Sequence, residues 1–476
     1  MTHKPIEIRE LSLSLPHKNC FEDFSATIRS GERIAIIGKN GSGKSTLLKI
    51  LLGLSEPTYG RVTIPVDVEF GYVQQVIEDF RNKSGGQRFH ESLNEALVAN
   101  PSVLLLDEPT NHLDSRNRKS LMRMINVFEG TVIVVSHDKE LLRNCFDIFW
   151  HIDNESVSQF SGKFDDYIRE RDIGRSKIMN ELSALGKEKK GAHSSLMKEQ
   201  KRASNSKDRG KKSIDNKKWP TIVGKSKATR AEQTSGKKKA DIRNKKDEVL
   251  DKLQNLRLPE EIKAKFSITT SDCINSNVVA IKDGAVGYGD FIVQNINISI
   301  GGTERVAILG DNGSGKSTLI KAIMGLEEIK RDGEWYVPKN ENIGYLDQHY
   351  SLLNGDESVF DSIEKLYPSW NDRDVRNHLN DFLFRKNEEV EILVKNLSGG
   401  EKARLSLACI AAKTPKVLIL DEITNNLDMD TIDHVVQVIR DYPGAVLAIS
   451  HNKDFLDQIG IATRYVVHQG SLVVER

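Results

Sequence analysis

Short apolar runs, each ending in a polar or glycine-rich segment, recur in both halves of the chain. The first half contains RIAII at 33–37 and VLLLD at 103–107, and the second contains RVAIL at 305–309 and VLILD at 417–421. Apolar runs of this length between turn-forming residues are typical of buried strands. Two of them lead through a glycine-rich loop into helix-like segments, LLKILLGL and LIKAIMGL. The pattern predicts an α/β fold that is built twice.

The glycine-rich loops themselves repeat. GKNGSGKST at 38–46 is matched by GDNGSGKST at 310–318, an offset of 272 residues. A chance match to G-x-x-x-x-G-K-[ST] is disfavoured because both copies stand between a strand and a helix, the context that makes the pattern a phosphate-binding loop. Its backbone N–H groups and the helix N-terminus attract phosphate, its Lys reaches the β- and γ-phosphates, and its Ser binds Mg²⁺. The predicted nucleotide-binding residues are Gly38, Asn40, Gly41, Ser42, Gly43, Lys44, Ser45 and Thr46, and Gly310, Asn312, Gly313, Ser314, Gly315, Lys316, Ser317 and Thr318.

Three further motifs recur downstream at a constant offset of 314 residues: KSGGQ with LSGGE, NHLD with NNLD, and SHD with SHN. The VLLLDE and VLILDE runs keep the same offset, and their Asp107 and Asp421 suit Mg²⁺ binding through water. The next residues, Glu108 and Glu422, are placed to orient and deprotonate an attacking water. Ser, His and Asp are also the residue types of a protease triad, but no nucleophile elbow supports that interpretation here. We therefore expect His137 and His451 to sense the γ-phosphate.

Composition limits the class of protein. A chain of 476 residues is long enough for two or three domains. Cys20, Cys145, Cys273 and Cys409 form no CxxC pair, so a metal site or disulfide framework is not expected and a reducing compartment fits. The sequence shows neither a signal-peptide pattern nor eighteen consecutive apolar residues. We expect a soluble, cytoplasmic protein.

The net charge of +1 hides an uneven distribution. Residues 175–248 contain 23 Lys and Arg against 9 Asp and Glu, a net of +14, so the rest of the chain carries −13. A basic segment on an acidic body indicates a polyanionic partner. The alternative is a solvated, disordered linker, and composition alone does not separate the two.

The paired motifs resemble those of the ATP-binding cassette superfamily, and two cassettes in one chain are similar to its ABC-F branch. The resemblance covers about 1–170 and 270–476. It implies two P-loop ABC nucleotide-binding domains that face head to tail, with two ATP molecules and Mg²⁺ bound between them and no partner subunit needed. Site one would combine Lys44, Gln75, Asp107, Glu108 and His137 with Ser398, Gly399 and Gly400; site two would combine Lys316, Gln348, Asp421, Glu422 and His451 with Ser84, Gly85 and Gly86. The implied metal-binding residues are Ser45, Gln75, Asp107, Ser317, Gln348 and Asp421, and Tyr288 fits the adenine-stacking position.

Several positions depart from the family pattern. Lys83 replaces the usual Leu before SGG, and Asn452 replaces an Asp. Ile423 and Asn426 stand where Pro and His are usual. The counterpart of Tyr288 falls near Leu15 or Pro16, which are not aromatic. The core catalytic groups are present in both halves, so we expect both sites to hydrolyse ATP, but unequally.

The change in offset from 272 to 314 locates a deletion. Ser398 lies 50 positions after Gln348, but Ser84 lies only nine positions after Gln75. The helical subdomain that ABC proteins carry in this span is therefore expected to be almost absent from the first cassette. In transporters this region contacts the membrane-spanning partner. In housekeeping ABC-F factors the region carries an additional arm, and loss of this arm is shared with the Vga, Lsa and Msr groups of antibiotic-resistance ABC-F proteins.

The basic segment between the cassettes has helical apolar spacing at its two ends. Ile178, Leu182 and Leu185 recur at i, i+4 and i+7, and a second such stripe at 249–256 precedes Pro259. We expect the base of an antiparallel α-helical hairpin whose first arm, from Ile178 to Trp219, extends about 60 Å. The predicted domains are 1–172, the linker 173–264 with its tip near 213–227, and 265–476.

The expected tip reads NKKWPTIVGKSK, an apolar group inside a lysine-rich tract. Lys and Arg neutralise phosphates without sequence preference, and an aromatic ring stacks on unpaired bases. In ABC-F proteins this linker enters the ribosomal E site and points toward the P-site tRNA and the peptidyl transferase centre. The alternative for Trp219 is packing within the hairpin loop itself. The predicted rRNA- and tRNA-contacting residues are Lys217, Lys218, Trp219, Pro220, Ile222, Val223 and Lys225.

The resemblance implies an ATPase that binds the ribosome and protects it from antibiotics acting at the peptidyl transferase centre or exit tunnel. A translation factor that rescues stalled ribosomes without drug would use the same parts. The energy-supplying subunit of a drug exporter is disfavoured by the shortened first cassette, and a nucleic-acid repair ATPase by the lack of zinc-binding cysteines.

Overall fold

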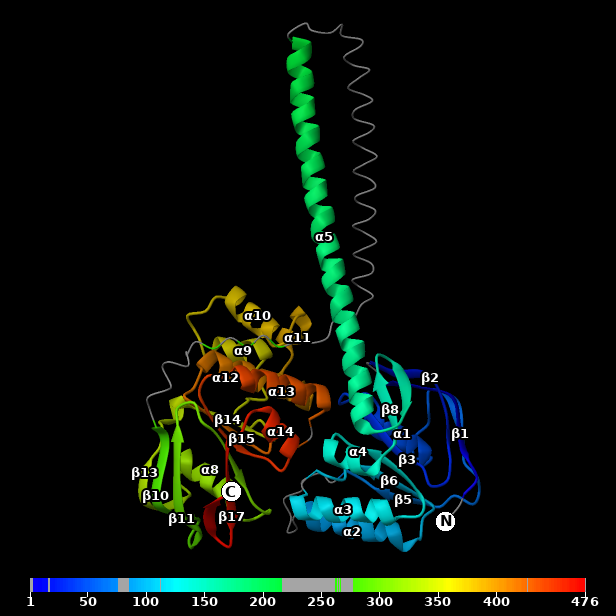
Figure 1. The fold of residues 1–476 in the computed structure, drawn as a ribbon, viewed down its shortest axis with the longest axis vertical. Helices are drawn as coiled ribbons and strands as arrows, with labels where there is room; N and C mark the ends of the chain where they lie inside the picture. The colour runs from blue at the N-terminus through cyan, green and yellow to red at the C-terminus, as the bar shows by residue number, and fades with distance from the viewer. Residues whose placement is uncertain are drawn as a thin grey trace. The chain divides into compact units, whose positions relative to one another are not determined.

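The structure is a computed structural model that describes residues 3–15, 18–75, 85–111, 113–215, 262, 264, 266, 277–425 and 427–475. Its contacts divide the chain into two compact units, Met1–Tyr167 with Glu261–Arg476, and Ile168–Glu260. The first unit contains both cassettes, and the second contains most of the linker (Figure 1). The predicted boundaries after residues 172 and 264 stay predictions, because this division groups the cassettes together.

The first cassette is built around a six-stranded sheet with the order β5-β6-β7-β3-β8-β9. All neighbours are parallel except β8 and β9. The inner strands β6 and β7 are buried along their whole length, which explains why they read as continuous apolar runs. The strands are β3 (Arg33–Gly38), β5 (Phe70–Val73), β6 (Val103–Asp107), β7 (Thr131–Val135), β8 (Ile148–Asp153) and β9 (Ser156–Ser161).

A separate antiparallel sheet with the order β2-β1-β4 completes the first cassette. Its buried side chains share one core with β3, α1 and β6, and that core includes Trp150, whose ring lies edge-on to Phe24 at 5.0 Å. The remaining elements are β1 (Ile6–Leu15), β2 (Lys18–Ile28), β4 (Tyr59–Thr63), α1 (Lys44–Leu51), α2 (Gly85–Val98), α3 (Ser115–Val127) and α4 (Lys139–Cys145).

The second cassette repeats this order. Its nine-stranded sheet runs β13-β10-β11-β18-β17-β12-β16-β15-β14, so β14-β15-β16-β12-β17 corresponds strand by strand to β5-β6-β7-β3-β8. The predicted duplicated α/β fold is confirmed. The strands are β10 (Asn277–Gly287), β11 (Phe291–Gly301), β12 (Arg305–Leu309), β13 (Lys330–Tyr336), β14 (Ile343–Asp347), β15 (Val417–Asp421), β16 (Ala445–Ile449), β17 (Thr463–His468) and β18 (Ser471–Val474).

The two cassettes differ in one corresponding span. In the first cassette it runs from β5 to α2, and in the second it runs from β14 to α12. In the second cassette this span folds into helices that bury Val375, Leu379 and Phe382 in the cassette's larger core. In the first cassette only the nine residues 76–84 stand between Gln75 and the start of α2, and these nine lie outside the described residues. The second cassette's helices are α8 (Lys316–Ile323), η1 (Asn340–Asn342), α9 (Val359–Glu364), α10 (Asp372–Asp381), α11 (Asn387–Glu391), η2 (Val394–Asn396), α12 (Gly399–Lys413), α13 (Met429–Asp441) and α14 (Lys453–Gln458).

Strand order determines where the motifs meet. Because β7 lies between β3 and β6, the segments that follow these three parallel strands emerge side by side at one sheet edge. They carry the phosphate loop, His137 and Glu108. The order β12-β16-β15 gives the second cassette the same arrangement.

The first arm of the linker is a single helix, α5 (Phe164–Asp215), of 52 residues (Figure 1). It spans about 78 Å at the usual helical rise. It begins fourteen residues before the predicted start at Ile178, directly after β9. Leu185 is buried, and Ile178 and Leu182 are half-buried, in agreement with the predicted stripe. The tip residues from Lys217 to Lys225 and the return arm lie outside the described residues.

Within the part of the chain that the structure describes, no helix has both the length and the apolar character needed to cross a membrane.

Candidate active sites

Each glycine-rich loop ends at a glycine that other residues do not fit. Gly43 and Gly315 precede helices α1 and α8 with φ of 94° and 103°. A Cβ on Gly43 would lie 2.9 Å from Leu13 Cδ2, and one on Gly315 would lie 2.5 Å from Val293 Cγ2. These glycines let the loop turn directly into the helix, so the helix's first N–H groups and the positive end of its dipole face the loop.

The loop lysines are buried beside backbone oxygens. Lys44 Nζ donates to the carbonyl oxygens of Gly38 at 2.8 Å and Lys39 at 3.0 Å. Lys316 Nζ makes the corresponding bonds in its own loop, at 2.8 and 2.9 Å. Burial is the main cause that lowers the pKa of both ammonium groups. A desolvated cation of this kind is stabilised by an anionic ligand.

Two loop hydroxyls provide a direct test of whether a nucleotide fits. Ser42 Oγ and Ser314 Oγ are buried, and neither has a hydrogen-bond partner among the described residues. Buried hydroxyl groups in folded proteins are normally paired. Phosphate oxygens at the mouth of each loop would accept these two protons, so the residues present fit the ATP phosphates.

The predicted metal ligands are oxygen groups next to these loops. Ser45 Oγ donates to Asp107 Oδ1 at 3.0 Å. Burial raises the pKa of Asp107, and burial with the charge of Glu422 raises the pKa of Asp421 to about 6. A nearby cation would favour the ionised carboxylates. Hydroxyl and carboxylate oxygens are the donors that Mg²⁺ prefers when it is shared with nucleotide phosphates, so this set fits Mg²⁺.

The two predicted glutamines follow β5 and β14, the strands that pair with β6 and β15. Gln75 is half-buried after β5. Gln348 follows β14, and its side chain lies 2.9 Å from His349 Nε2 and 3.5 Å from Asn425 Nδ2.

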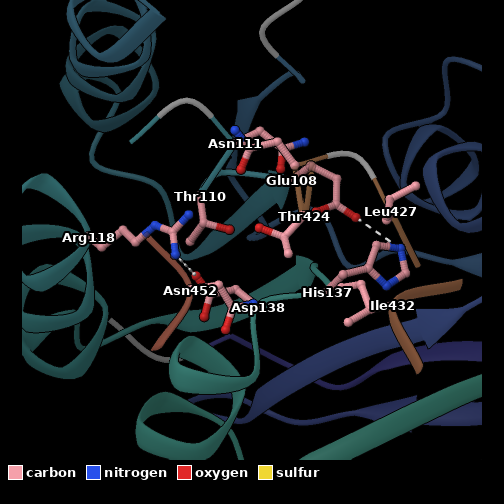
Figure 2. Close-up of a pocket in the computed structure, with 11 residues that line it drawn as sticks. Glu108, Thr110, Asn111, Arg118, His137, Asp138, Thr424, Leu427, Ile432 and Asn452 are labelled. Atoms are coloured by element: carbon pink, nitrogen blue, oxygen red, sulfur yellow. Dashed lines mark ion pairs between the residues drawn. The ribbon is translucent and has the colours of Figure 1, made fainter. Parts of the chain in front are cut away.

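Glu108 and His137 form the centre of the first cassette's site (Figure 2). Glu108 has a left-handed backbone, with φ of 47°, and its N–H donates to the carbonyl oxygen of Val135 at 2.8 Å. Its carboxylate lies 3.3 Å from His137 Nε2. Burial raises the pKa of Glu108 to about 8 and lowers the pKa of His137 to about 3, so the imidazole is neutral. A carboxyl group with a raised pKa beside a neutral imidazole is suited to accept a proton from water.

Glu422 repeats this backbone geometry in the second cassette. Its φ is 50°, and its N–H donates to Ile449 at 2.9 Å. Its carboxylate is farther from the histidine, 3.7 Å from His451 Nε2, and accepts a hydrogen bond from Asn425 Nδ2 at 3.1 Å. Burial lowers the pKa of His451 to about 4. The two sites thus share their groups but differ in detail.

A group from the second cassette enters the first cassette's phosphate loop. Asp428 Oδ2 accepts a hydrogen bond from the N–H of Asn40 at 2.8 Å. Burial opposes ionisation of Asp428, but its hydrogen bonds from the N–H groups of Asn40 and Thr431 keep its pKa below the ordinary value. Sequence reasoning noted the NNLD motif without giving its last residue a role. The signal was there, since Asp428 and Asp114 are the fourth residues of both copies.

The structure describes only part of the two SGG motifs that were predicted to contact nucleotide. Ser398 caps α12, where its N–H and Oγ both donate to Glu401 Oε2, at 2.8 and 2.6 Å. Gly399 and Gly400 follow at the helix start, as Gly85 and Gly86 do in α2. Ser84 lies outside the described residues. Their contact with the nucleotide of the opposite cassette stays a prediction.

The predicted adenine-stacking residue is accessible. Tyr288 follows β10 and is 53% exposed, and its hydroxyl accepts a hydrogen bond from Lys321 Nζ at 3.2 Å. Of its two candidate counterparts, Leu15 at the end of β1 is 42% exposed and offers no ring, and Pro16 lies outside the described residues.

The chain resembles several known proteins in sequence. The family described as "ABC transporter" matches residues 21–76 and 293–425, and an AAA domain described as "putative AbiEii toxin, Type IV TA system" matches 89–143. The chain is 30% identical to the ATP-binding protein Uup of Buchnera aphidicola subsp. Acyrthosiphon pisum, across 95% of this chain and 78% of Uup. The chain belongs to the ABC-F family. It is also 27% identical to the ribosome protection protein VmlR of Bacillus subtilis, across 95% of this chain and 85% of VmlR.

Other relatives of this ABC-F protein support the same fold. It is 27% identical to the probable ATP-binding protein YheS of Haemophilus influenzae, over 96% of this chain and 78% of YheS. The solved structure of an RNase-L Inhibitor aligns with a TM-score of 0.58 and 18% identity, over 93% of this chain and 86% of that one. The ABC fold with two cassettes and a helical insert is therefore shown.

Three of the departures from the family pattern, Ile423, Asn426 and Asn452, lie around the second cassette's catalytic segment. Ile423 is buried with 1% exposure, where Pro is usual. Asn452 accepts a hydrogen bond from the N–H of Phe455 at 3.0 Å and so caps α14 as an Asp would. Lys83, Asn426 and Pro16 lie outside the described residues. How these changes affect the two hydrolysis rates stays a prediction.

The close contact that a Cβ on Gly43 would make with Leu13 predicts that one added methyl group weakens ATP binding. Gly43→Ala places a Cβ against Leu13 and also strains a positive φ, so ATP affinity should fall at least tenfold. Gly53→Ala is the control, since Gly53 has a φ of 72° but open space around it. Equilibrium binding of a fluorescent ATP analogue measures both. Equal losses in the two variants would contradict the steric argument.

The raised pKa of Glu108 predicts a pH-dependent stability. A carboxyl whose folded-state pKa is about 8, against an ordinary value of 4.5, stabilises the fold below 4.5 and loses that contribution as pH rises through 8. Glu108→Gln removes this ionisation. The variant should therefore gain thermal stability over the wild type at about pH 8.5 and much less at about pH 5.

Thermal melts of nucleotide-free protein at both pH values test this, with the exposed Glu334→Gln as control. A gain of the same size at both pH values would contradict the proposed ionisation.

Proposed function

We propose that this ABC-F protein hydrolyses ATP at two sites and acts on the ribosome, protecting it from antibiotics that bind at the peptidyl transferase centre or exit tunnel. The observation that carries the proposal is the attachment of α5, a 52-residue helix with an exposed basic surface, to a pair of nucleotide-binding cassettes. The resemblance to VmlR, a ribosome protection protein, supports the target.

The geometry supports hydrolysis by the following roles. Lys44 and the unpaired Ser42 hydroxyl would hold the phosphates of site one, and Asp428 would fix the loop from the other side. Glu108 would accept the proton of the attacking water, and the charge of Lys44 lowers its pKa against the effect of burial. Neutral His137 would contact the γ-phosphate. Mg²⁺, held by Ser45 with Asp107 and by Ser317 with Asp421, would neutralise phosphate charge.

The linker supports binding to RNA. Lys187, Lys189, Lys190, Lys198, Lys201 and Arg202 of α5 are all exposed. A helix about 78 Å long that presents many cations binds a polyanion through counterion release. The proposed contacts at Lys217, Lys218, Trp219, Pro220, Ile222, Val223 and Lys225, with the E site and the P-site tRNA as their targets, lie outside the described residues and stay proposals. Cassette closure on ATP would set the linker in place, and hydrolysis would release it.

A translation factor that rescues stalled ribosomes without drug is the second candidate. Uup and YheS, which are named only as ATP-binding proteins, resemble the chain as closely as VmlR does. An exporter subunit is a weaker candidate, because the span that contacts the membrane partner in transporters has at most nine residues between Gln75 and Gly85 in the first cassette.

Blocking hydrolysis should trap the protein on its target. The double variant Glu108→Gln with Glu422→Gln keeps ATP bound, so it should co-sediment with ribosomes at least tenfold more with ATP than without. Adding Lys44→Ala and Lys316→Ala is the control, because it removes the cation from both phosphate loops and should abolish the gain. If ATP does not increase co-sedimentation, the ribosomal function is wrong.

Growth in drug separates protection from rescue. Expression of the wild-type chain in a sensitive bacterium should raise the inhibitory concentration of at least one lincosamide, pleuromutilin, streptogramin A, macrolide or phenicol. Trp219→Ala should remove this protection while ATPase activity stays intact, whereas Trp219→Phe keeps a ring for stacking. No shift with any drug would favour rescue, and full protection by Trp219→Ala would show that the ring has no part in it.

A further inference from the structure

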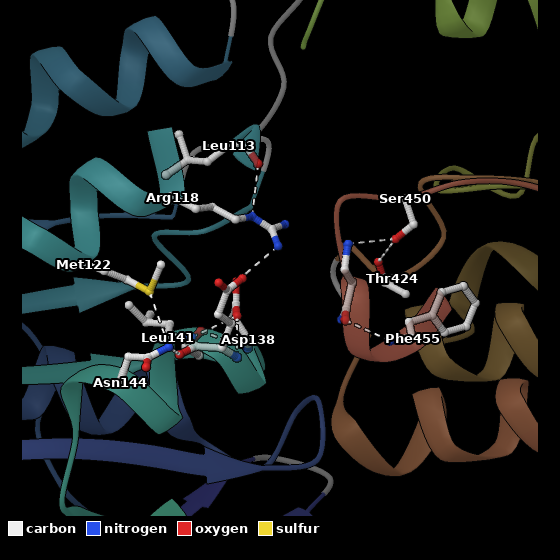
Figure 3. A network of polar contacts seen from close by, with 12 residues as sticks. Leu113, Arg118, Met122, Asp138, Leu141, Asn144, Thr424, Ser450 and Phe455 are labelled. Atoms are coloured by element: carbon white, nitrogen blue, oxygen red, sulfur yellow. Dashed lines mark hydrogen bonds and ion pairs between the residues drawn. The ribbon is translucent and has the colours of Figure 1, made fainter. Parts of the chain in front are cut away.

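Arg118 and Asp138 form a buried ion pair in the first cassette that no catalytic role requires. Arg118 Nη1 lies 3.2 Å from Asp138 Oδ2, and the two side chains are only 11% and 9% exposed. Arg118 Nε also donates to the carbonyl oxygen of Leu113 at 3.1 Å. Figure 3 shows the arginine reaching from α3 toward both groups.

The pair joins two segments that serve different ATP sites. Asp138 follows His137 directly and caps α4 by accepting hydrogen bonds from the N–H groups of Glu140 and Leu141 at 2.9 and 3.1 Å. It therefore fixes the backbone that carries the histidine of site one. Leu113 precedes Asp114, whose counterpart Asp428 enters the opposite phosphate loop.

Asp114 acts on the second cassette through its charge. Its charge raises the pKa of both Lys316 and His451, although burial lowers both overall. Arg118 and Asp138 also line a single pocket with Thr424, Ile432 and Asn452 of the second cassette (Figure 2). The ion pair thus lies where the Asp114 loop of one cassette meets the catalytic segment of the other.

The second cassette lacks this pair. The constant offset of 314 residues places Ile432 at the position of Arg118 and Asn452 at that of Asp138. Ile432 is 3% exposed, and Asn452 only caps its own helix. In the second cassette the corresponding segments are linked by neutral hydroxyls, Thr424 Oγ1 and Ser450 Oγ at 3.2 Å (Figure 3). The first cassette has the same residue types at these positions, Thr110 and Ser136, in addition to its ion pair.

These two links differ in strength. A charge-assisted bond between buried groups is stronger and more directional than a hydroxyl–hydroxyl bond. Breaking it by removing one partner also leaves a buried charge without compensation, so the two segments are held to one geometry. The His137 side is therefore rigidly tied to the Asp114 loop, and the His451 side is tied loosely to the Asp428 loop.

We propose that Arg118 and Asp138 are positioning residues that make hydrolysis at site one depend on nucleotide at site two, with no equally strong dependence in the reverse direction. The inference rests on the proposed ATPase function. When nucleotide in site two fixes the position of the Asp114 loop, the ion pair fixes the position of Asp138. Asp138 in turn positions His137 beside Glu108. Rate coupling of this kind need not be symmetric, although binding coupling is reciprocal.

The test replaces the pair by the second cassette's own residues, Arg118→Ile with Asp138→Asn, which leaves no buried charge unpaired. Phosphate release in a single turnover is measured in two backgrounds, Glu422→Gln, where only site one reacts, and Glu108→Gln, where only site two reacts. We expect about a tenfold loss of rate at site one without a change in KM for ATP, and less than a twofold change at site two. Equal losses in both backgrounds, or no loss, would overturn the proposal.

A double-mutant cycle separates coupling from a structural role. Lys316→Ala weakens nucleotide binding at site two, so in the Glu422→Gln background it should remove most of the effect of the Arg118→Ile with Asp138→Asn change. Fully additive effects would overturn the proposal. Failure of the unmodified chain to hydrolyse ATP at all would instead contradict the proposed function.

A reverse transplant covers the case in which the first variant does not fold. Ile432→Arg with Asn452→Asp gives the second cassette an ionic link. The turnover rate at site two, measured with Glu108→Gln, should then become more sensitive to Lys44→Ala than it is without the transplant. If that sensitivity does not appear, the ion pair does not couple the sites.

Discussion

The structure depends on the constraint that parallel strands present their carboxyl ends at a single sheet edge. The order β6-β7-β3 places three separate segments of the first cassette there, and β15-β16-β12 does the same in the second. Residues that are up to 100 positions apart in sequence, from Gly38 to Asp138, thereby form a single site. The left-handed backbone at Glu108 and Glu422 follows from this arrangement. Each residue leaves its strand while its N–H still pairs with the neighbouring strand, and this turns the carboxylate toward the histidine.

The first cassette's phosphate loop is contacted by the opposite cassette. The hydrogen bond from the Asn40 N–H to Asp428 joins residues 388 positions apart and puts an ionised carboxylate at the entrance of a loop suited to anions. That carboxylate stabilises the loop backbone before nucleotide binds. The loop that carries Asp428 also contacts its own cassette's Glu422, which accepts a hydrogen bond from Asn425 Nδ2 at 3.1 Å. A shift of one loop therefore bears on both sites.

Much of this could be predicted from local patterns. The apolar runs, the repeated motifs and their constant offset were enough for the duplicated fold and for the ends of β3, β6, β12 and β15. The stripe of Ile178, Leu182 and Leu185 predicted a helix, but its true start at Phe164 was missed because α5 continues without a break from the first cassette. The contact of Asp428 with Asn40, and the pairing of Arg118 with Asp138, could not be read from spacing. They depend on how surfaces distant in sequence meet, and a single sequence contains no local signal for that.

The linker shows why one chain combines a long basic helix with two ATP sites. An isolated helix gains little stability from its own sequence, and most helices in proteins are held by packing along one face. In α5 the covered positions fall near its base, at Ile178, Leu182 and Leu185, while Lys187, Lys189, Lys190 and Lys198 beyond them are exposed. Like charges repel along that exposed part, and a polyanion relieves the repulsion. Binding energy available from such a surface is large but not selective, since phosphate contacts carry no sequence information. A protein that relies on it needs a separate means of release, and in the proposed function hydrolysis at the two nucleotide sites would provide one.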